Sequence, residues 1–173
     1  MSADYPETWM FSNSEPPKPS KLDVDPADVL RILNLHHLSK LVAERGVPMH
    51  GAPAVGLPLH SNGHLGADLV HVKAGDQFPV HTHPGDHLLL SLGGRGTITV
   101  ADVTYVVEPG DIYMVDGLVP HAVGAHPDSE HILVAIGAPH KAVDSPERMA
   151  WTDWLGRPVD APILPSSVQG DAA

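Results

Sequence analysis

Short apolar segments, many with strand-like alternation of apolar and polar residues, make up the chain from residue 47 onward. Gly, Pro, Asp and Asn separate these segments at the spacing typical of an all-β domain. Short strands joined by tight turns favour a sandwich or a barrel. The predicted strands cover residues 69–74, 79–83, 87–94, 96–101, 103–108, 111–116, 121–125 and 131–138.

Residues 25–46 have a different period, with apolar side chains at the three- and four-residue spacing of a helix. Asp25 suits the N-cap, Pro26 suits the first helical position, and Gly46 suits the C′ position after the last turn. The pattern therefore predicts one amphipathic helix ahead of the strands.

The length of 173 residues suffices for one domain with a core, but not for two comfortable ones. We expect a barrel domain over residues 47–150. Residues 1–24 lack an apolar period and are expected to form an extended arm, and residues 151–173 a C-terminal tail. One small barrel has too little surface to pack the arm, the helix and the tail residues Trp151 and Trp154. We therefore expect a homodimer.

Charge and composition narrow the choice of partners. The formal net charge of −11, with 10 Lys plus Arg, disfavours nucleic acid and anionic membrane surfaces, which would be repelled at long range. No apolar run reaches the roughly 20 residues that span a bilayer, and the first residues lack the features of a signal peptide. We therefore expect a cytoplasmic protein. Because the chain contains 0 Cys, any metal must be held by nitrogen or oxygen.

Three histidines stand within the stretch HTHPGDH, out of 13 in the chain. His81 and His83 are two residues apart, so on an extended strand both side chains leave the same face. The Pro-Gly-Asp turn then allows the chain to reverse and brings His87 beside the pair. His121, at the start of another predicted strand, can complete a set of four imidazoles. These spacings predict a metal site.

The first of these segments resembles the first motif of the cupin family. The resemblance lies in Gly75-x5-His81-x-His83-x3-His87-x6-Gly94. His87 stands where that family usually has a glutamate, which makes the segment similar to the smaller four-histidine cupins.

A second segment, Gly110-x5-Asp116-x-Leu118-x2-His121, is similar to the second cupin motif. It is looser, because Asp116, Leu118 and Ala125 stand in the places of the usual Pro, Gly and Asn. The resemblance covers roughly residues 66–138. It implies an antiparallel β-barrel of jelly-roll type with one metal ion bound inside by the histidines of both motifs.

Four neutral imidazoles would leave the full dipositive charge on the ion, making it a stronger Lewis acid than a site with a carboxylate ligand. If the ion is octahedral, two positions stay open for a substrate that chelates through two oxygens, or for one substrate oxygen beside O2. Iron, zinc and manganese are the expected metals, with copper and nickel as further possibilities. The expected partner is a small oxygen-chelating molecule.

Strand parity predicts the walls of the site. Leu89 and Ser91 share the face of His87, while Leu88, Leu90 and Leu92 face the other way. The polar candidates for orienting a substrate or moving a proton are Gln77, Tyr105, Tyr113 and His131. Five further histidines fall in loop-like sequence and are expected to be solvated: His50, His60, His64, His126 and His140.

Three functions remain open. The first is a metal-dependent dioxygenase that binds an enol, diketone or carboxylate together with O2. The second is a redox-inert Lewis-acid cyclase, isomerase or lyase, as in the cupin polyketide cyclases with four histidines. The third is a non-catalytic, metal-dependent small-molecule binding barrel. A nucleophilic hydrolase is disfavoured, because the chain has neither a G-x-S-x-G elbow nor a cysteine.

Overall fold

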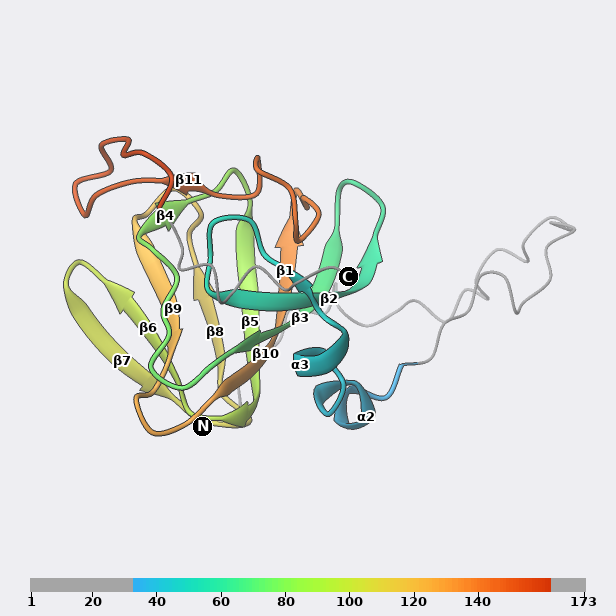
Figure 1. Ribbon diagram of the computed structural model, residues 1–173. Coiled ribbons are helices and arrows are strands. Elements are labelled where there is room, and N and C mark those ends of the chain that lie inside the picture. The colour runs from blue at the N-terminus through green and yellow to red at the C-terminus, as the bar shows by residue number, and fades with distance from the viewer. Residues whose placement is uncertain (1–32, 163–173) are drawn as a thin grey trace, which may run out of the picture. The chain divides into compact units, whose positions relative to one another are not determined.

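A computed structural model describes residues 33–162, and those from Asn34 onward belong to one compact unit. Two antiparallel sheets make up most of it (Figure 1). The larger sheet has the spatial order β1 (Val47–Pro48), β2 (Ala54–Ser61), β3 (Gly66–Val72), β10 (His131–Ala138), β5 (Asp86–Gly94) and β8 (Ile112–Val115). The smaller sheet has the order β11 (Ala150–Trp151), β4 (His81–Thr82), β9 (His121–Ala125), β6 (Gly96–Val100) and β7 (Val103–Val107).

This all-β arrangement fits a jelly roll and confirms the predicted fold class. Within the described residues no strand pair joins the two sheets, so the barrel consists of two packed sheets rather than one closed sheet. No described helix is both long enough and apolar enough to cross a membrane.

All eight predicted segments contain a strand, although residues 79–83 keep only the two-residue β4. The pattern missed β1, β2 and β11. In β2 the pairing with β3 is irregular between Pro58 and His60. Because proline cannot donate to a ladder, a proline inside an apolar run argues against a strand, and the irregularity is what accommodates it here.

The prediction of one helix over residues 25–46 is wrong for its described part. Two short helices are present, α2 (Leu35–Ser39) and α3 (Val42–Arg45), and the N-cap of α2 is Asn34, whose side chain accepts a hydrogen bond from the His37 N–H at 3.1 Å. Gly46 caps α3 in an extended conformation, φ −67° and ψ 146°, rather than a left-handed one. The break allows side chains of both helices to pack on one apolar cluster. Asp25 and Pro26, like the predicted arm, lie outside the described residues.

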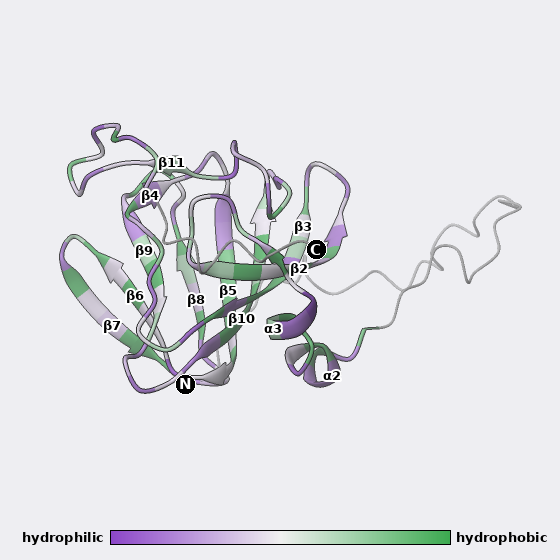
Figure 2. Ribbon diagram, in the orientation of Figure 1, coloured by the Kyte–Doolittle hydropathy of each residue, from purple (hydrophilic) through white to green (hydrophobic). Residues whose placement is uncertain are grey.

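Two apolar clusters lie on opposite faces of the larger sheet. The cluster between the sheets includes Leu89 and Leu133, which are 3% and 2% exposed. The outer cluster includes Val42 of α3, and Leu90 and Leu92 pack against it. The predicted parity of β5 is therefore confirmed. Apolar stretches run along the strands of both sheets in Figure 2, and β11 brings the start of the predicted tail back onto β4.

Candidate metal centre

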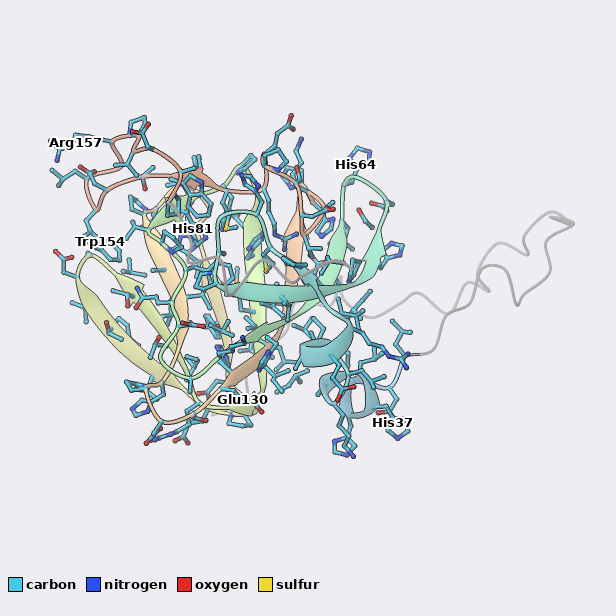
Figure 3. The ribbon with its side chains drawn as sticks, viewed as in Figure 1. His37, His64, His81, Glu130, Trp154 and Arg157 are labelled. Atoms are coloured by element: carbon cyan, nitrogen blue, oxygen red, sulfur yellow. The ribbon has the colours of Figure 1, made fainter. Side chains whose placement is uncertain are left out.

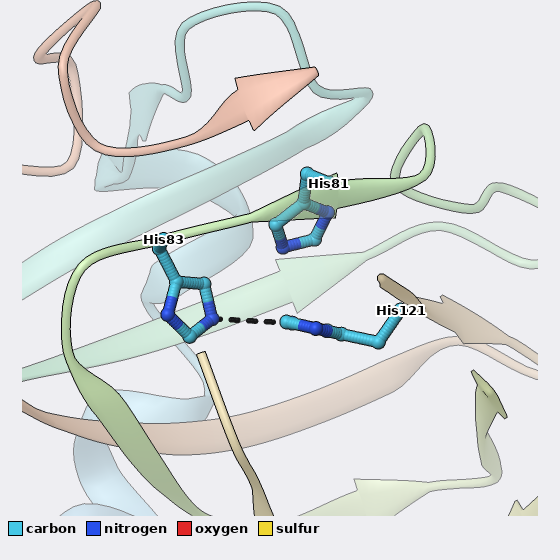
Figure 4. Close-up of side chains that lie close together, drawn as sticks. All are labelled: His81, His83 and His121. Carbon is cyan, nitrogen blue, oxygen red and sulfur yellow. Dashed lines mark hydrogen bonds between the residues drawn. The ribbon is translucent and has the colours of Figure 1, made fainter. Parts of the chain in front are cut away.

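Strand pairing brings three of the predicted ligands together. His81 of β4 lies directly opposite His121 of β9. His83 follows β4, and its backbone N–H donates a hydrogen bond to the carbonyl of Gly117 at 2.8 Å. One ring nitrogen from each of these histidines lies within 4.8 Å of the others (Figure 4). All three side chains are buried, at 4%, 3% and 1% exposure.

Each of the three rings is oriented by a backbone carbonyl. The Nδ1–H donors and their acceptors are His81 to Pro79 (2.8 Å), His83 to Gly85, and His121 to Val119 (2.7 Å). Because a carbonyl oxygen can only accept, the proton of each neutral ring is fixed on Nδ1. Each Nε2 therefore keeps a lone pair for a ligand, as in metal sites whose histidines are oriented by outer hydrogen bonds.

Two of these lone pairs face one another. His83 Nε2 lies 3.1 Å from His121 Nε2. Burial lowers the pKa of both rings, that of His121 to about 4, so at neutral pH neither ring gains a proton to place between them. A cation between the nitrogens would turn this repulsive contact into two bonds. The donor set, neutral imidazole nitrogen, fits a divalent transition metal.

His87 lies beside this cluster. Its ring stacks on that of His83, with centroids 4.0 Å apart and planes at 21°. Burial, followed by the charges of His83 and Arg148, lowers the pKa of His87 to about 2. A β-carbon at residue 137 would lie 2.8 Å from His87 Nε2, so Gly137 makes room for the ring. The compact cluster thus contains three histidines, and the four-histidine set stays a prediction.

The histidines border a cavity of about 40 Å³. At roughly 10–15 Å³ for each water, it has room for about three water molecules, or for the end of a small ligand. His81, His87, His121 and Arg148 form its polar part. The other walls are apolar and include the predicted wall residue Leu89.

Two of the four polar candidates lie on the smaller sheet, and neither is among the residues that line the cavity. Tyr105 is 58% exposed on β7. Gln77 is exposed and forms a backbone bridge to Gly124 at the margin of that sheet. The structure therefore does not bring either residue to the histidines, and their catalytic roles stay predictions.

The other two candidates lie on the larger sheet. His131 is fully buried, its Nδ1–H donates to the Gly124 carbonyl at 3.0 Å, and its Nε2 accepts from the Ser91 hydroxyl at 3.2 Å. Both of its ring nitrogens are therefore occupied. Tyr113 lies opposite Leu89, and its buried hydroxyl has no hydrogen-bond partner among the described residues. Burial raises the pKa of Tyr113, which keeps the phenol protonated.

A buried polar network escaped the sequence pattern, which placed His140 on a solvated loop. Instead, His140 is 7% exposed, donates from Nε2 to Asp68 Oδ2 at 2.9 Å, and accepts at Nδ1 from the Ser61 hydroxyl at 2.9 Å. Arg148 Nη1 lies 2.8 Å from the same oxygen of Asp68. A signal was present in the sequence, since a carboxylate inside an apolar strand requires a buried partner.

Comparison with known proteins agrees with this geometry. Residues 68–137 match the cupin domain family. The polyketide cyclase RemF from Streptomyces resistomycificus is similar in structure, with a TM-score of 0.53 and 16% identity over 64% of this chain and 80% of that one. The protein TT1209 from Thermus thermophilus has a TM-score of 0.53 and 22% identity over 65% of this chain and 100% of its own. At these identities the likeness extends to the fold alone. No curated protein matches the sequence.

Proposed function

We propose that this chain, whose residues 68–137 form a cupin domain, is a metal-dependent enzyme acting on a small oxygen-chelating substrate. The observation that carries the proposal is the approach of two imidazole lone pairs, His83 Nε2 and His121 Nε2, to 3.1 Å, with His81 beside them. These three residues would hold one divalent transition metal ion, with His87 as the proposed fourth ligand. Iron, zinc and manganese suit imidazole nitrogen, as do copper and nickel.

A bound divalent metal supplies Lewis acidity and, where it is iron or manganese, redox chemistry with O2. The protein contributes the surroundings. Carbonyl acceptors hold the rings in one tautomer, so the site needs little reorganisation. Leu89, Phe78 and Leu133 give the cavity apolar walls, and an electrostatic interaction with an oxygen ligand is stronger beside such walls than in bulk water.

A dioxygenase is the reaction class we favour, with an enol, a diketone or a carboxylate as substrate. Neutral ligands leave the positive charge of the ion uncompensated, which favours an enolate or carboxylate oxygen. The apolar walls suit O2, a small apolar co-substrate.

A redox-inert Lewis-acid cyclase, isomerase or lyase is the second candidate. A histidine-only donor set also suits zinc, which has no redox chemistry. A polyketide cyclase has a similar fold, so the fold is compatible with this class of reaction. A non-catalytic binding barrel is the third.

The metal assignment is tested by mass spectrometry on protein purified without added metal. We expect about one transition metal ion per chain, and none in a His81→Ala, His83→Ala double variant, because one remaining close ligand cannot retain it. The matched control is a His60→Ala, His64→Ala double variant. Both of these histidines are exposed, and Figure 3 shows His64 at the surface, away from His81. Stoichiometric metal in the first variant would overturn the assignment.

The reaction class is tested by loading the protein separately with iron, manganese or zinc. Oxygen consumption is then followed with a panel of diketones, catechols and enols. We expect consumption by the iron or manganese form and none by the zinc form. If every redox-active form fails to consume oxygen while the zinc form converts a carbonyl compound, the Lewis-acid alternative replaces the dioxygenase. If no form turns over any compound, yet ligands bind only with metal present, the chain is a binding barrel.

A further inference from the structure

Arg148 is the only Lys or Arg that is buried among residues 33–162, at 5% exposure. Arginine is rarely buried unless it is paired, because taking a guanidinium out of water is costly. This one is placed on the wall of the cavity that His81, His87 and His121 also line. The chain, which has an excess of acidic residues overall, thus keeps a positive group at its histidine cluster.

One nitrogen of the guanidinium makes all the contacts that tie Arg148 to the protein within the described residues. Nη1 donates to the carbonyl of Lys141 and lies 2.8 Å from Asp68 Oδ2. Asp68 is fully buried and is held in turn by His140, which donates to the same carboxylate oxygen at 2.9 Å. These contacts fix one edge of the guanidinium.

The other edge is left for a ligand. In the described part of the chain, neither Nε nor Nη2 has a protein hydrogen-bond partner, and neither is among the buried polar atoms that lack one. A guanidinium presents its donors as a planar fork that matches a carboxylate. Arg148 is among the residues that line the cavity, and neither of these two donors is sealed inside the protein without a partner.

We propose that Arg148 binds the carboxylate of a small anionic substrate whose neighbouring oxygen meets the histidine cluster. This inference rests on the proposed function and narrows its substrate class to 2-oxo or 2-hydroxy carboxylates and their enolates. The cavity of about 40 Å³ has room for such an anionic end. Asp68 contacts the guanidinium, His140 contacts Asp68, and neither residue lines the cavity. Both are therefore positioning residues.

Pyruvate and pyruvamide test this inference, because they have nearly the same shape and differ in charge. Isothermal titration calorimetry of the zinc-loaded protein measures the affinity for each. We expect pyruvate to bind at least tenfold more tightly than pyruvamide, and an Arg148→Gln variant to reduce this preference at least tenfold. The matched control is Arg95→Gln, since Arg95 pairs with Asp128 at the surface and does not line the cavity. An unchanged preference in the Arg148→Gln variant would overturn the inference.

Arg148→Gln alone leaves the carboxylate of Asp68 buried with one partner and can prevent folding. An Asp68→Asn, Arg148→Gln double variant removes both charges together, and it too is expected to lose the preference for pyruvate. Asp68→Asn alone keeps a side-chain oxygen that can accept from Arg148 Nη1 but removes the competing negative charge, so this variant should bind pyruvate severalfold more tightly than the wild type. A purely structural ion pair predicts no such gain, so equal or weaker pyruvate binding by this variant counts against the inference.

Titration of metal-free protein separates this inference from the proposed function. If the protein binds no metal but still prefers pyruvate through Arg148, the anion site stands and the metal-dependent function fails. If the protein holds its metal and binds pyruvate and pyruvamide equally, the metal centre stands and the role of Arg148 fails.

Discussion

Acid is expected to unfold the metal-free protein, because its buried histidines are neutral in the folded state. Burial lowers the pKa of His121 and His131 from 6.5 to about 4 in each case. The unfolded chain therefore binds more protons than the folded one between these values, so stability is fully present above about pH 6.5 and is lost as the pH falls towards 4. Each pKa is lowered by about 2.5, and one pKa unit corresponds to about 1.4 kcal/mol. Each histidine therefore removes about 3 kcal/mol of folding stability when the pH falls through the whole window.

At about pH 5 the two histidines together are expected to lower the free energy of unfolding by about 4 kcal/mol. This is a large part of the roughly 5–15 kcal/mol that stabilises a typical domain. Urea unfolding followed by tryptophan fluorescence, to which the buried Trp151 contributes, measures this difference at about pH 7 and about pH 5. A His131→Gln variant should lower the mean slope of unfolding free energy against pH between these two values by about 0.9 kcal/mol per unit, while an exposed-site control, His64→Ala, should leave it unchanged.

Equal unfolding free energies at the two pH values would refute the argument that these imidazoles are buried and neutral. An undiminished slope in the His131→Gln variant would refute it for that residue. Saturating zinc should add about 2.7 kcal/mol at neutral pH when its concentration is about 100 times Kd. This gain should shrink as protons compete for the same nitrogens.

Three further outcomes are expected. A His87→Glu variant should keep its metal in mass spectrometry but bind pyruvate more weakly in calorimetry, because the added carboxylate reduces the positive charge of the centre; undiminished binding would contradict this. Gly117→Ala should weaken metal binding at least tenfold in a chelator competition, since its β-carbon would lie 2.6 Å from His83 Nδ1 and close against the His83 carbonyl oxygen; wild-type affinity would show that the loop yields without moving the ligand. Light scattering should give twice the chain mass of 18.4 kDa, as the proposed homodimer requires, and a monomer mass would refute it.

The sequence by itself determined the features that depend on local geometry. The two-residue period of a strand placed His81 and His83 on one face, and both are buried in the same cluster. The same period separated Leu89 from Leu90 into different apolar clusters. The glycine at the end of the first histidine motif, Gly94, has φ +67°, a backbone conformation that favours glycine. Each of these follows from a few neighbouring residues.

Only the tertiary structure decided what distant segments do to one another. The helical period of residues 25–46 gave no sign of the break before Val42, which arises because α3 must pack on the sheet. Tyr105 and Tyr113 have similar strand patterns and both lie on edge strands, β7 and β8, yet Tyr105 is 58% exposed whereas Tyr113 packs against the apolar cluster between the sheets. Local period cannot distinguish the two faces of a sheet until its partners are known.

The network of Asp68, His140 and Arg148 was decided by the tertiary structure in the same way. Asp68 is far in the sequence from His140 and Arg148, and although a carboxylate beside an apolar strand calls for a buried partner, nothing local identifies these two residues as that partner. All three become buried because β3 and the segment after β10 pack together, and once buried each needs the others to offset the loss of water. Periodicity shows which face of an element is apolar. The pairing of buried charges depends instead on contacts between elements, and these contacts are fixed only when the whole domain folds.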